Sequence, residues 1–480
     1  MKQGDLPKAL QFADESLLRG WHDMKTRSLK ASILAHLDGR SDEYRLFAEE
    51  SMAIDPLYNS LLCRVNPEEF DRATGGRAEA YLNAAYELTG FGFPQDAADL
   101  LAKCPAETPM KYYAKAYAEG KPGLTDEARK DAEKAESLPT DFCFPNRAEE
   151  KSMLEYAVSI LDTAPKAHYY LGELLYDKKQ YDAAVRHWQE AVKEKPDLAP
   201  AHRNLSIAYY NHGDRSLAEG EIAEAVQLEP DNSRYLLEQD QLLKRLDRPA
   251  PERLAILEAH REIVPDRCPL MLAYISLLNR TGQYEKALDL LTRYTFHVWE
   301  GGEGKVADEY KTALFALSEK AMADGEYRDA IAFAERTLKY PENLGEGKLE
   351  NVPDNRAYYV MGCACRALGD EVKAREQFEK AAAGSRIPEP VRYYNDQPSD
   401  YIYYQGLAFH ALGRDEEARE SFRRLVEFGE SHITDEVGYD FFAVSMPELE
   451  VYQDDIQKRS DDYCRRLTEL GRRGLKEIEG

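Results

Sequence analysis

Two loops in the C-terminal part of the sequence combine carboxylates, glycines and a tryptophan. RYTFHVWEGGEGKVADEY at 293–310 and KYPENLGEGKLENVPDNR at 339–356 both contain Gly-Glu-Gly, and their central residues Glu303 and Glu346 are 43 positions apart. Glycines permit close backbone approach, while an indole face beside carboxylates suits sugars or cationic groups. We therefore expect a polar ligand site framed by Trp299, Glu300, Glu303, Asn343, Glu346 and Arg356. The alternative is that the glycines serve long turns and that Trp299 fills a gap between packed elements.

No catalytic residue is assigned from the sequence. A pair of carboxylates such as Glu303 and Glu346 could serve a hydrolase, but their separation and pKa do not follow from sequence. His168 and His202 look like a pair of ligands, yet ring packing between helices explains them better. The ten histidines form no H-x-x-x-H or Cys-His cluster, and no phosphate loop or nucleophile elbow is present. We predict no enzyme activity, no metal and no cofactor.

Composition and charge narrow the range of partners. Lys and Arg total 63 against 88 Asp and Glu, and the resulting formal charge of −25 disfavours binding to nucleic acid. No run of about 18 apolar residues is present, so a membrane span is not expected. The seven cysteines are scattered, which favours reduced thiols and predicts a cytoplasmic protein.

An internal repeat indicates which elements position the candidate residues. KAHYYLGELLYDKKQYDAAVRHWQEAVKEKP, from residue 166, and PAHRNLSIAYYNHGDRSLAEGEIAEAVQLEP, from residue 200, place small residues at the same offsets. Ala184 and Ala218 occupy one such offset, 34 positions apart. Small residues let two helices approach closely, and a final proline stops the second helix. Each pair leaves an apolar face that the next pair covers, so the units must stack.

This period and these signature residues resemble the tetratricopeptide repeat (TPR) family. The matching residues are Leu171, Gly172, Leu175, Ala184, Trp188, Ala191 and Pro196, then Leu205, Ser206, Tyr209, Ala218, Ile222, Ala225 and Pro230. The resemblance implies an all-α fold, a right-handed superhelical solenoid of antiparallel helix pairs. It also implies that Tyr359 and Tyr403, at position 5 of two later first helices, face the concave surface. We add both to the ligand-binding candidates; the alternative is that they pack inside the repeats.

Repeat regularity divides the chain into three segments. Residues 1–140 hold degenerate helical pairs. Residues 141–265 hold the central repeats, with irregular flanks where Pro145 and the 231–266 segment interrupt the pattern. Residues 266–480 hold the later repeats, the Gly-Glu-Gly loops and a terminal helical cap.

Two further expectations concern the ends of the chain. The opening GDLPKALQFADESL resembles a second helix without its first, so we expect a piece of a longer protein. Its uncovered apolar face makes a homo-oligomer an alternative.

The resemblance implies a function as well. TPR proteins typically bind peptides or partner proteins in the concave groove, so we predict a non-enzymatic scaffold for a protein segment or a neighbouring domain of its own full-length chain. The strings FHVWEGGEGKV, YPENLGEGKL and YYNDQPSDYIYYQGLA also resemble the C-terminal half of large bacterial proteins with a β-rich N-terminal domain. That likeness implies the alternative function, a carbohydrate-associated module, with any catalysis in the missing N-terminal part. The alternative predicts that Trp299, Glu303, Glu346 and Tyr403 converge on one pocket.

Overall fold

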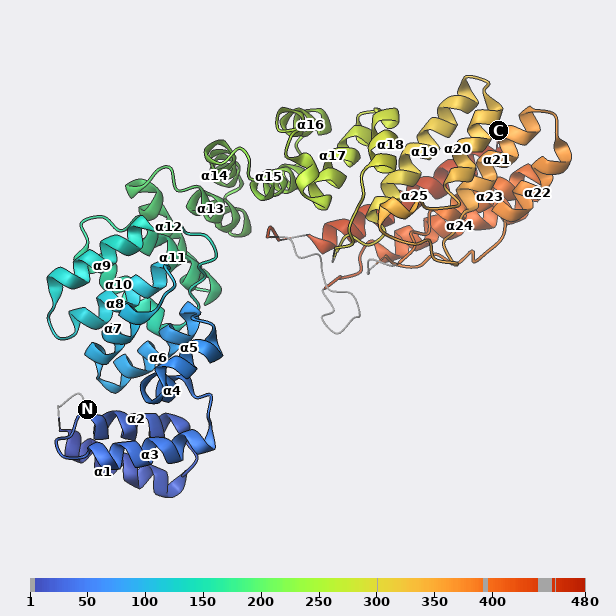
Figure 1. Ribbon diagram of the computed structural model, residues 1–480. Coiled ribbons are helices and arrows are strands. Elements are labelled where there is room, and N and C mark those ends of the chain that lie inside the picture. The colour runs from blue at the N-terminus through green and yellow to red at the C-terminus, as the bar shows by residue number, and fades with distance from the viewer. Residues whose placement is uncertain (1–4, 300, 392–395, 439–450, 454, 480) are drawn as a thin grey trace. The chain divides into compact units, whose positions relative to one another are not determined.

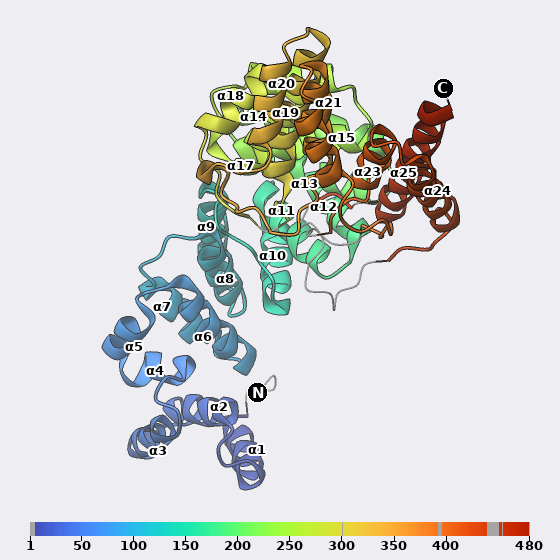
Figure 2. The ribbon, with the colours of Figure 1, turned by 90° about the vertical axis from the view of Figure 1, so that its right-hand side faces the viewer.

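The protein is built of helices. The computed structural model describes residues 5–299, 301–391, 396–438, 451–453 and 455–479, and these residues form 25 α-helices and two short 3-10 helices without any strand (Figures 1 and 2). The prediction of an all-α fold is confirmed. Nothing in these ranges corresponds to the β-rich domain that the second resemblance implies. No helix within them combines the length and the apolar character needed to cross a membrane.

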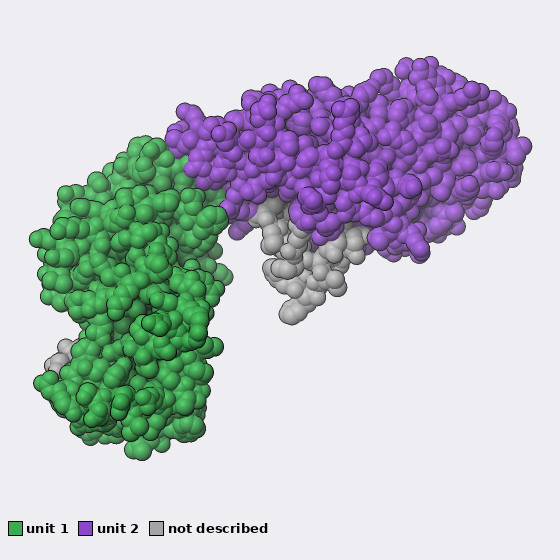
Figure 3. Space-filling model, in the orientation of Figure 1, with its two compact units in different colours: residues 1–208 green, residues 209–480 purple. Residues whose placement is uncertain are grey.

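Contacts between residues divide the chain into two compact units. Unit 1 comprises residues 1–208 and unit 2 residues 209–480, so the division falls within α13 (Ala199–Asn211) (Figure 3). The three segments expected from the sequence were defined by how regular the repeats are, whereas these two units are defined by contacts. The three segments therefore remain a prediction.

Unit 1 consists of short helices that pack against their neighbours in sequence. They are α1 (Leu6–Arg19), α2 (Met24–Ala35), α3 (Ser41–Ile54), α4 (Asn59–Val65), α5 (Pro67–Thr74), α6 (Ala78–Phe91), α7 (Pro94–Lys103), α8 (Pro109–Gly120), α9 (Thr125–Ser137), α10 (Ala148–Ile160), α11 (Pro165–Asp177), α12 (Tyr181–Glu194) and the start of α13. The segment 138–147 forms no helix, as Pro145 predicts, and α10 packs directly against α8.

Unit 2 continues the pattern of paired helices. Its helices are α14 (Arg215–Leu228), α15 (Ser233–Arg245), α16 (Ala250–Ala259), α17 (Cys268–Arg280), α18 (Tyr284–Arg293), α19 (Lys305–Ala323), α20 (Tyr327–Arg336), α21 (Asn355–Ala367), α22 (Glu371–Ala381), α23 (Tyr401–Ala411), α24 (Asp415–His432) and α25 (Ile456–Glu479), with 3-10 turns η1 (Val264–Asp266) and η2 (Glu342–Leu344). From α15 to α24 the odd-numbered helix is the first of each pair. The long α25 packs along α24 and also contacts α23.

Small residues set the distance between paired helices, as the repeat pattern predicts. A Cβ atom added at Gly362 would lie 2.6 Å from the Phe378 ring, and the same conflict arises between Gly406 and Phe422. Phe378 and Phe422 are both fully buried. The glycine on one helix therefore makes room for the aromatic ring on the next, which packs at interior density.

Prolines end the second helices of the two central repeats. Helix α12 stops at Glu194 and α14 at Leu228, in each case two residues before the proline of the signature, Pro196 or Pro230. Helical geometry is disfavoured for the residue before a proline, so these prolines fix where the second helices end.

Candidate functional site: the first-helix groove of unit 2

Two adjoining pockets lie along the first helices of unit 2. The proximal pocket, about 430 Å³, is lined by α15, α16, α17 and the start of α19 together with Trp299. The distal pocket, about 480 Å³, is lined by α19, the start of α21, the Gly-Glu-Gly loops and the segment leading into α23. Asp308 of α19 lines both. We call this surface the first-helix groove.

The two Gly-Glu-Gly loops are joined by hydrogen bonds at the distal pocket. The Glu346 carboxylate accepts from the backbone N–H groups of Gly304 (2.8 Å) and Ala307 (3.1 Å), which belong to the otherwise unpaired N-terminus of α19. An anionic side chain is also favoured at that end of a helix by the helix dipole. Glu346 therefore lines the pocket while serving as a cap for α19.

Asn343 has an architectural role. Its Nδ2 donates to the carbonyls of Leu291 and Tyr294, each at 2.8 Å, and its own carbonyl accepts from the Phe296 N–H. Gly345 follows with φ +79°, and a Cβ there would lie 2.6 Å from the Phe296 carbonyl oxygen. Only a glycine at position 345 lets the backbone of the second loop lie this close to the Phe296 carbonyl. The second loop therefore packs directly against the segment that follows α18.

Glu303 and Arg356 bring unsatisfied polar atoms to the distal pocket. Glu303 Oε2 and Arg356 Nε are both buried and have no hydrogen-bond partner among the described residues. The Arg356 guanidinium lies 4.3 Å from the Phe315 ring centroid and pairs with Glu319 at 2.6 Å. A buried polar atom without a partner costs free energy that a ligand recovers by supplying the missing hydrogen bond. The two residues that line this pocket thus carry one unused acceptor and one unused donor.

A lysine lies beside these atoms. Lys311 is paired with Asp308 at 2.8 Å, and burial of the amine lowers its pKa, but Asp308 and Tyr340 outweigh that effect and raise it above the ordinary value. Lys311 therefore carries a firmly held positive charge into the distal pocket.

The proximal pocket has a buried ion pair at its base. Arg253 donates from Nε and Nη2 to the two carboxylate oxygens of Asp240, at 2.9 and 2.7 Å, and both side chains are about 5% exposed or less. The exposed Arg280 lies at the same pocket and makes no ion pair with any residue in the described ranges. It is therefore available to an acidic group of a ligand.

The structure separates the remaining predicted residues. Trp299 lines the proximal pocket, with its ring packed on Gly302, and Glu300 lies outside the described residues. Tyr403 is 3% exposed, and its hydroxyl donates to Glu477 at 2.9 Å, so it lines neither pocket. Tyr359 is half-buried, and burial raises the pKa of its hydroxyl beside Cys363. Thus Trp299, Glu303, Glu346 and Tyr403 do not line one common pocket.

Sequence reasoning missed several residues of the groove. Tyr401 and Tyr404 line the distal pocket in place of Tyr403, while Tyr393 and Tyr394 lie outside the described residues. Arg280 and Lys311 were also missed. The sequence places Arg280 and Lys311 on first helices of the repeats, and that position is the signal that could have identified them. Because Lys and Arg also occur on solvated helix faces, the residue type alone does not mark a binding residue.

The histidines singled out in the sequence lie in unit 1 and have other neighbours. His168 Nδ1 is 2.8 Å from His187 Nδ1, and burial lowers the His168 pKa. His202 Nε2 is 2.9 Å from the Pro196 carbonyl oxygen. Across the described ranges, no three His, Cys, Asp or Glu side chains are grouped as metal ligands.

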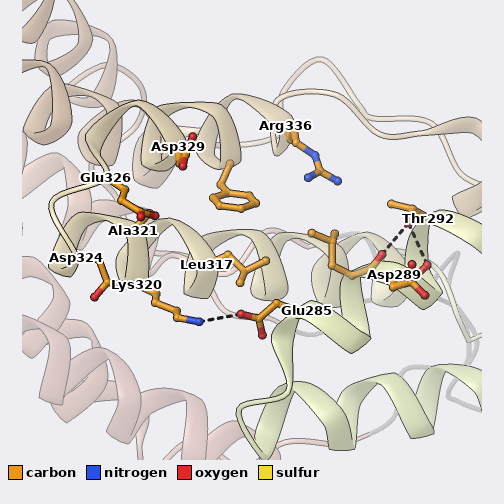
Figure 4. Close-up of a pocket in the computed structure, with 12 residues that line it drawn as sticks. Glu285, Asp289, Thr292, Leu317, Lys320, Ala321, Asp324, Glu326, Asp329 and Arg336 are labelled. Atoms are coloured by element: carbon orange, nitrogen blue, oxygen red, sulfur yellow. Dashed lines mark hydrogen bonds and ion pairs between the residues drawn. The ribbon is translucent and has the colours of Figure 1, made fainter.

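A third pocket of about 480 Å³ lies between α18, α19 and α20 (Figure 4). Its lysine, Lys320, already pairs with Glu285 at 2.9 Å, and the acidic Asp324, Glu326 and Asp329 stand at one end. None of the residues predicted from the sequence lines it, so we favour the first-helix groove.

Comparisons with known proteins agree with the repeat pattern. A family profile described as TPR repeat matches residues 172–213, and one described as tetratricopeptide repeat matches residues 356–383. The response regulator aspartate phosphatase H of Bacillus subtilis (strain 168) is 24% identical over 258 residues, which cover 45% of this chain and 67% of that protein.

Solved structures of repeat proteins were also found. MamA from Desulfovibrio magneticus RS-1 is 19% identical and covers 39% of this chain and 94% of its own, with a TM-score of 0.24. The TPR domain of P58(IPK) is 14% identical and covers 99% of both chains, with a TM-score of 0.25. At such scores the whole backbones superpose poorly, so the assignment depends on the two profile matches and the helix pairs described above. The chain contains tetratricopeptide repeats.

Proposed function

We propose that this chain is a non-enzymatic scaffold whose first-helix groove binds an extended segment of a partner protein or of a neighbouring domain of its own full-length chain. The supporting observation is the pair of pockets that meet at Asp308, because adjoining pockets on successive helices suit a ligand with anchoring groups along its length. Phe315 and Leu272 supply apolar lining for the two pockets. The charged residues Arg280, Lys311 and Arg356 would orient a bound segment.

The chemistry of the groove fits a polypeptide. Glu303 Oε2 accepts and Arg356 Nε donates, which matches the N–H and C=O groups that every peptide backbone carries. Arg280 adds a site for an acidic side chain. The name of the Bacillus subtilis relative describes a protein that acts on response regulators, which are proteins. We extend to this chain only the engagement of a protein and not the phosphatase activity.

Peptide selection followed by calorimetry tests the proposal. Peptides from a random library are selected on the purified chain, and their Kd is compared for the unchanged protein and Arg280→Glu. We expect the substitution to weaken binding about tenfold or more, since it reverses a charge at the pocket. Arg328→Glu is the matched control, because Arg328 is an exposed arginine of α20 that lines neither pocket. Peptides that bind both variants and Glu303→Gln as tightly as the unchanged chain would place the interaction elsewhere.

The carbohydrate-associated alternative has less support. Part of the Trp299 ring is covered by Gly302, the Tyr403 hydroxyl is engaged with Glu477, and Glu346 caps α19. Calorimetry with mono- and oligosaccharides decides it: a heat of binding that disappears in both Trp299→Ala and Glu303→Ala would favour the sugar module over the peptide scaffold.

Location and self-association are separate proposals. All seven cysteines are free, which suits a reducing cytoplasm. Burial raises the pKa of six of them: Cys63, Cys104, Cys143, Cys363, Cys365 and Cys464. Phe12, Leu18 and Trp21, in and just after α1, are 59%, 87% and 63% exposed, which supports a self-associating surface. Sedimentation at several concentrations tests this, and a monomer throughout counts against it.

A further inference from the structure

A short segment close to the C-terminus lies against the end of α13. Asn211 Nδ2 donates to the Val451 carbonyl at 3.2 Å, and the Gln453 N–H donates to Asn211 Oδ1 at 3.0 Å. One carboxamide therefore pairs with the carbonyl and the N–H on either side of Tyr452. These groups lie 240 or more positions apart in the sequence, and all belong to unit 2.

Tyr452 is the anchor of this segment. Its side chain is 1% exposed, which places it among the largest fully buried side chains of the chain. The Tyr210 ring packs edge-on against it, with centroids 5.4 Å apart and planes at 81°. Such edge-to-face contact adds to the gain from burying an aromatic ring. A second contact lies six positions later in the sequence, where Lys458 Nζ forms an ion pair with the Asp247 carboxylate at 3.3 Å.

This combination has the two parts of a peptide-recognition site. The Asn211 carboxamide hydrogen-bonds backbone atoms on both sides of Tyr452, and every extended segment presents such atoms. The buried position beside the Tyr210 ring holds one aromatic side chain and so supplies selectivity. Neither part involves a residue of the two pockets in the first-helix groove. The site is therefore independent of the function proposed above.

We propose that Tyr210 and Asn211 form a recognition site for an extended segment that carries a tyrosine, that Val451–Gln453 occupies it in cis, and that a tyrosine-bearing segment of a partner protein binds there by displacing it. The chain's own segment acts as an internal competitor. Because it is tethered, its effective concentration is roughly millimolar, so a partner must offer more than the same few contacts or act when the segment is released.

Peptide binding to variants of the full chain tests the proposal. The probe is a dye-labelled peptide with the sequence of residues 451–458, VYQDDIQK. Its fluorescence polarisation should show binding to Tyr452→Ala at least about tenfold tighter than to the unchanged chain, because the competitor is weakened. The double variant Asn211→Ala/Tyr452→Ala should lose that binding, and the peptide VAQDDIQK, without the tyrosine, should not bind. If the Tyr452→Ala chain is folded and does not bind the labelled peptide, the proposal is wrong.

Hydrogen exchange on the unchanged chain gives an answer that does not depend on the variant folding. The Gln453 amide should be protected, and unlabelled VYQDDIQK at millimolar concentration should accelerate its exchange severalfold while VAQDDIQK does not. Exchange that is unaffected by either peptide would mean that the segment is a fixed part of the fold, and the site would then recognise nothing else.

Discussion

Two largely buried carboxylates, Glu136 in unit 1 and Glu303 in unit 2, are used differently. In unit 1, Glu136 accepts hydrogen bonds from the Tyr113 hydroxyl at 2.7 Å and from the backbone N–H groups of Lys166 and Ala167, both at 2.9 Å, so it joins α8 and α9 to α11. In unit 2, Glu303 brings a buried oxygen to a pocket, and no residue that the structure describes donates a hydrogen bond to it. The same residue type thus serves architecture where neighbouring backbone donors are within reach, and remains available for a ligand where they are not.

The largest effect is expected at the ion pair below the proximal pocket. Asp240→Ala leaves the buried Arg253 guanidinium unpaired, which should lower the free energy of unfolding by about 3–5 kcal/mol in urea denaturation. Glu379→Ala removes an exposed pair with Arg375 and serves as the control, with a change below about 0.5 kcal/mol. Equal effects of the two substitutions would show that the buried pair is not structural.

Removal of the Glu136 carboxylate should destabilise unit 1. Glu136→Ala leaves one hydroxyl and two backbone N–H groups without their acceptor, for an expected loss of about 2–3 kcal/mol by chemical denaturation. Glu303→Gln in unit 2 is the partner experiment, and it should change stability by less than about 0.5 kcal/mol. If Glu303→Gln were the more damaging of the two, the distinction between these two carboxylates would be wrong.

Unit 1 should also show a pH dependence that arises at Glu173. Burial raises the pKa of this carboxyl to about 7, although the Tyr169 hydroxyl donates to it at 2.7 Å. The folded pKa lies above the unfolded one, so the stabilising contribution is present in acid and is lost as pH rises from about 4.5 to 7. Glu173→Gln should therefore flatten the stability profile in that window and raise stability at pH 7 by about 2 kcal/mol.

Glu119 contributes to the same window, because burial also raises its pKa to about 7. The measurement is consequently the difference between the profiles of the unchanged chain and Glu173→Gln, obtained by thermal or urea unfolding at a series of pH values. Two parallel profiles would mean that Glu173 titrates with the same pKa in the folded and unfolded chain.

The smallest effect on stability is expected at the joined loops. Glu346→Ala removes the cap of α19 and should cost about 1 kcal/mol. Glu346→Gln keeps one acceptor oxygen and should recover part of the loss. Hydrogen exchange at the first turn of α19 follows the change locally, and unaltered protection of Gly304 and Ala307 would contradict the assignment of Glu346 as a cap.

The sequence predicted the fold well because its determinants are local. Gly362 and Gly406 stand opposite buried phenylalanines at fixed offsets, so the close approach of paired helices follows from spacing alone. Pro145 likewise predicted the missing helix before α10. These effects act within one repeat or between adjacent repeats, where sequence distance and spatial distance agree.

The site was predicted only in part because its details depend on backbone donors and helix rotation. Glu303, Glu346 and Arg356 do line one pocket, as their loops and repeat position suggested. Glu346 caps α19 because the N–H groups of Gly304 and Ala307 point toward its carboxylate. The direction of these N–H groups cannot be inferred from residue types. Tyr403 and Tyr404 differ by about 100° of helix rotation, enough to exchange a buried ring for one that lines the pocket.

The contact between Asn211 and the Val451–Gln453 segment bears on how unit 2 folds and unfolds. In a stacked array each repeat touches only its neighbours, and the end repeats fray independently of the middle. A contact across 240 positions closes a long loop whose entropic cost is met only after the intervening helices have formed. We expect this contact to form last, and while it holds, the first and last helices of unit 2 are tied into one cooperative transition.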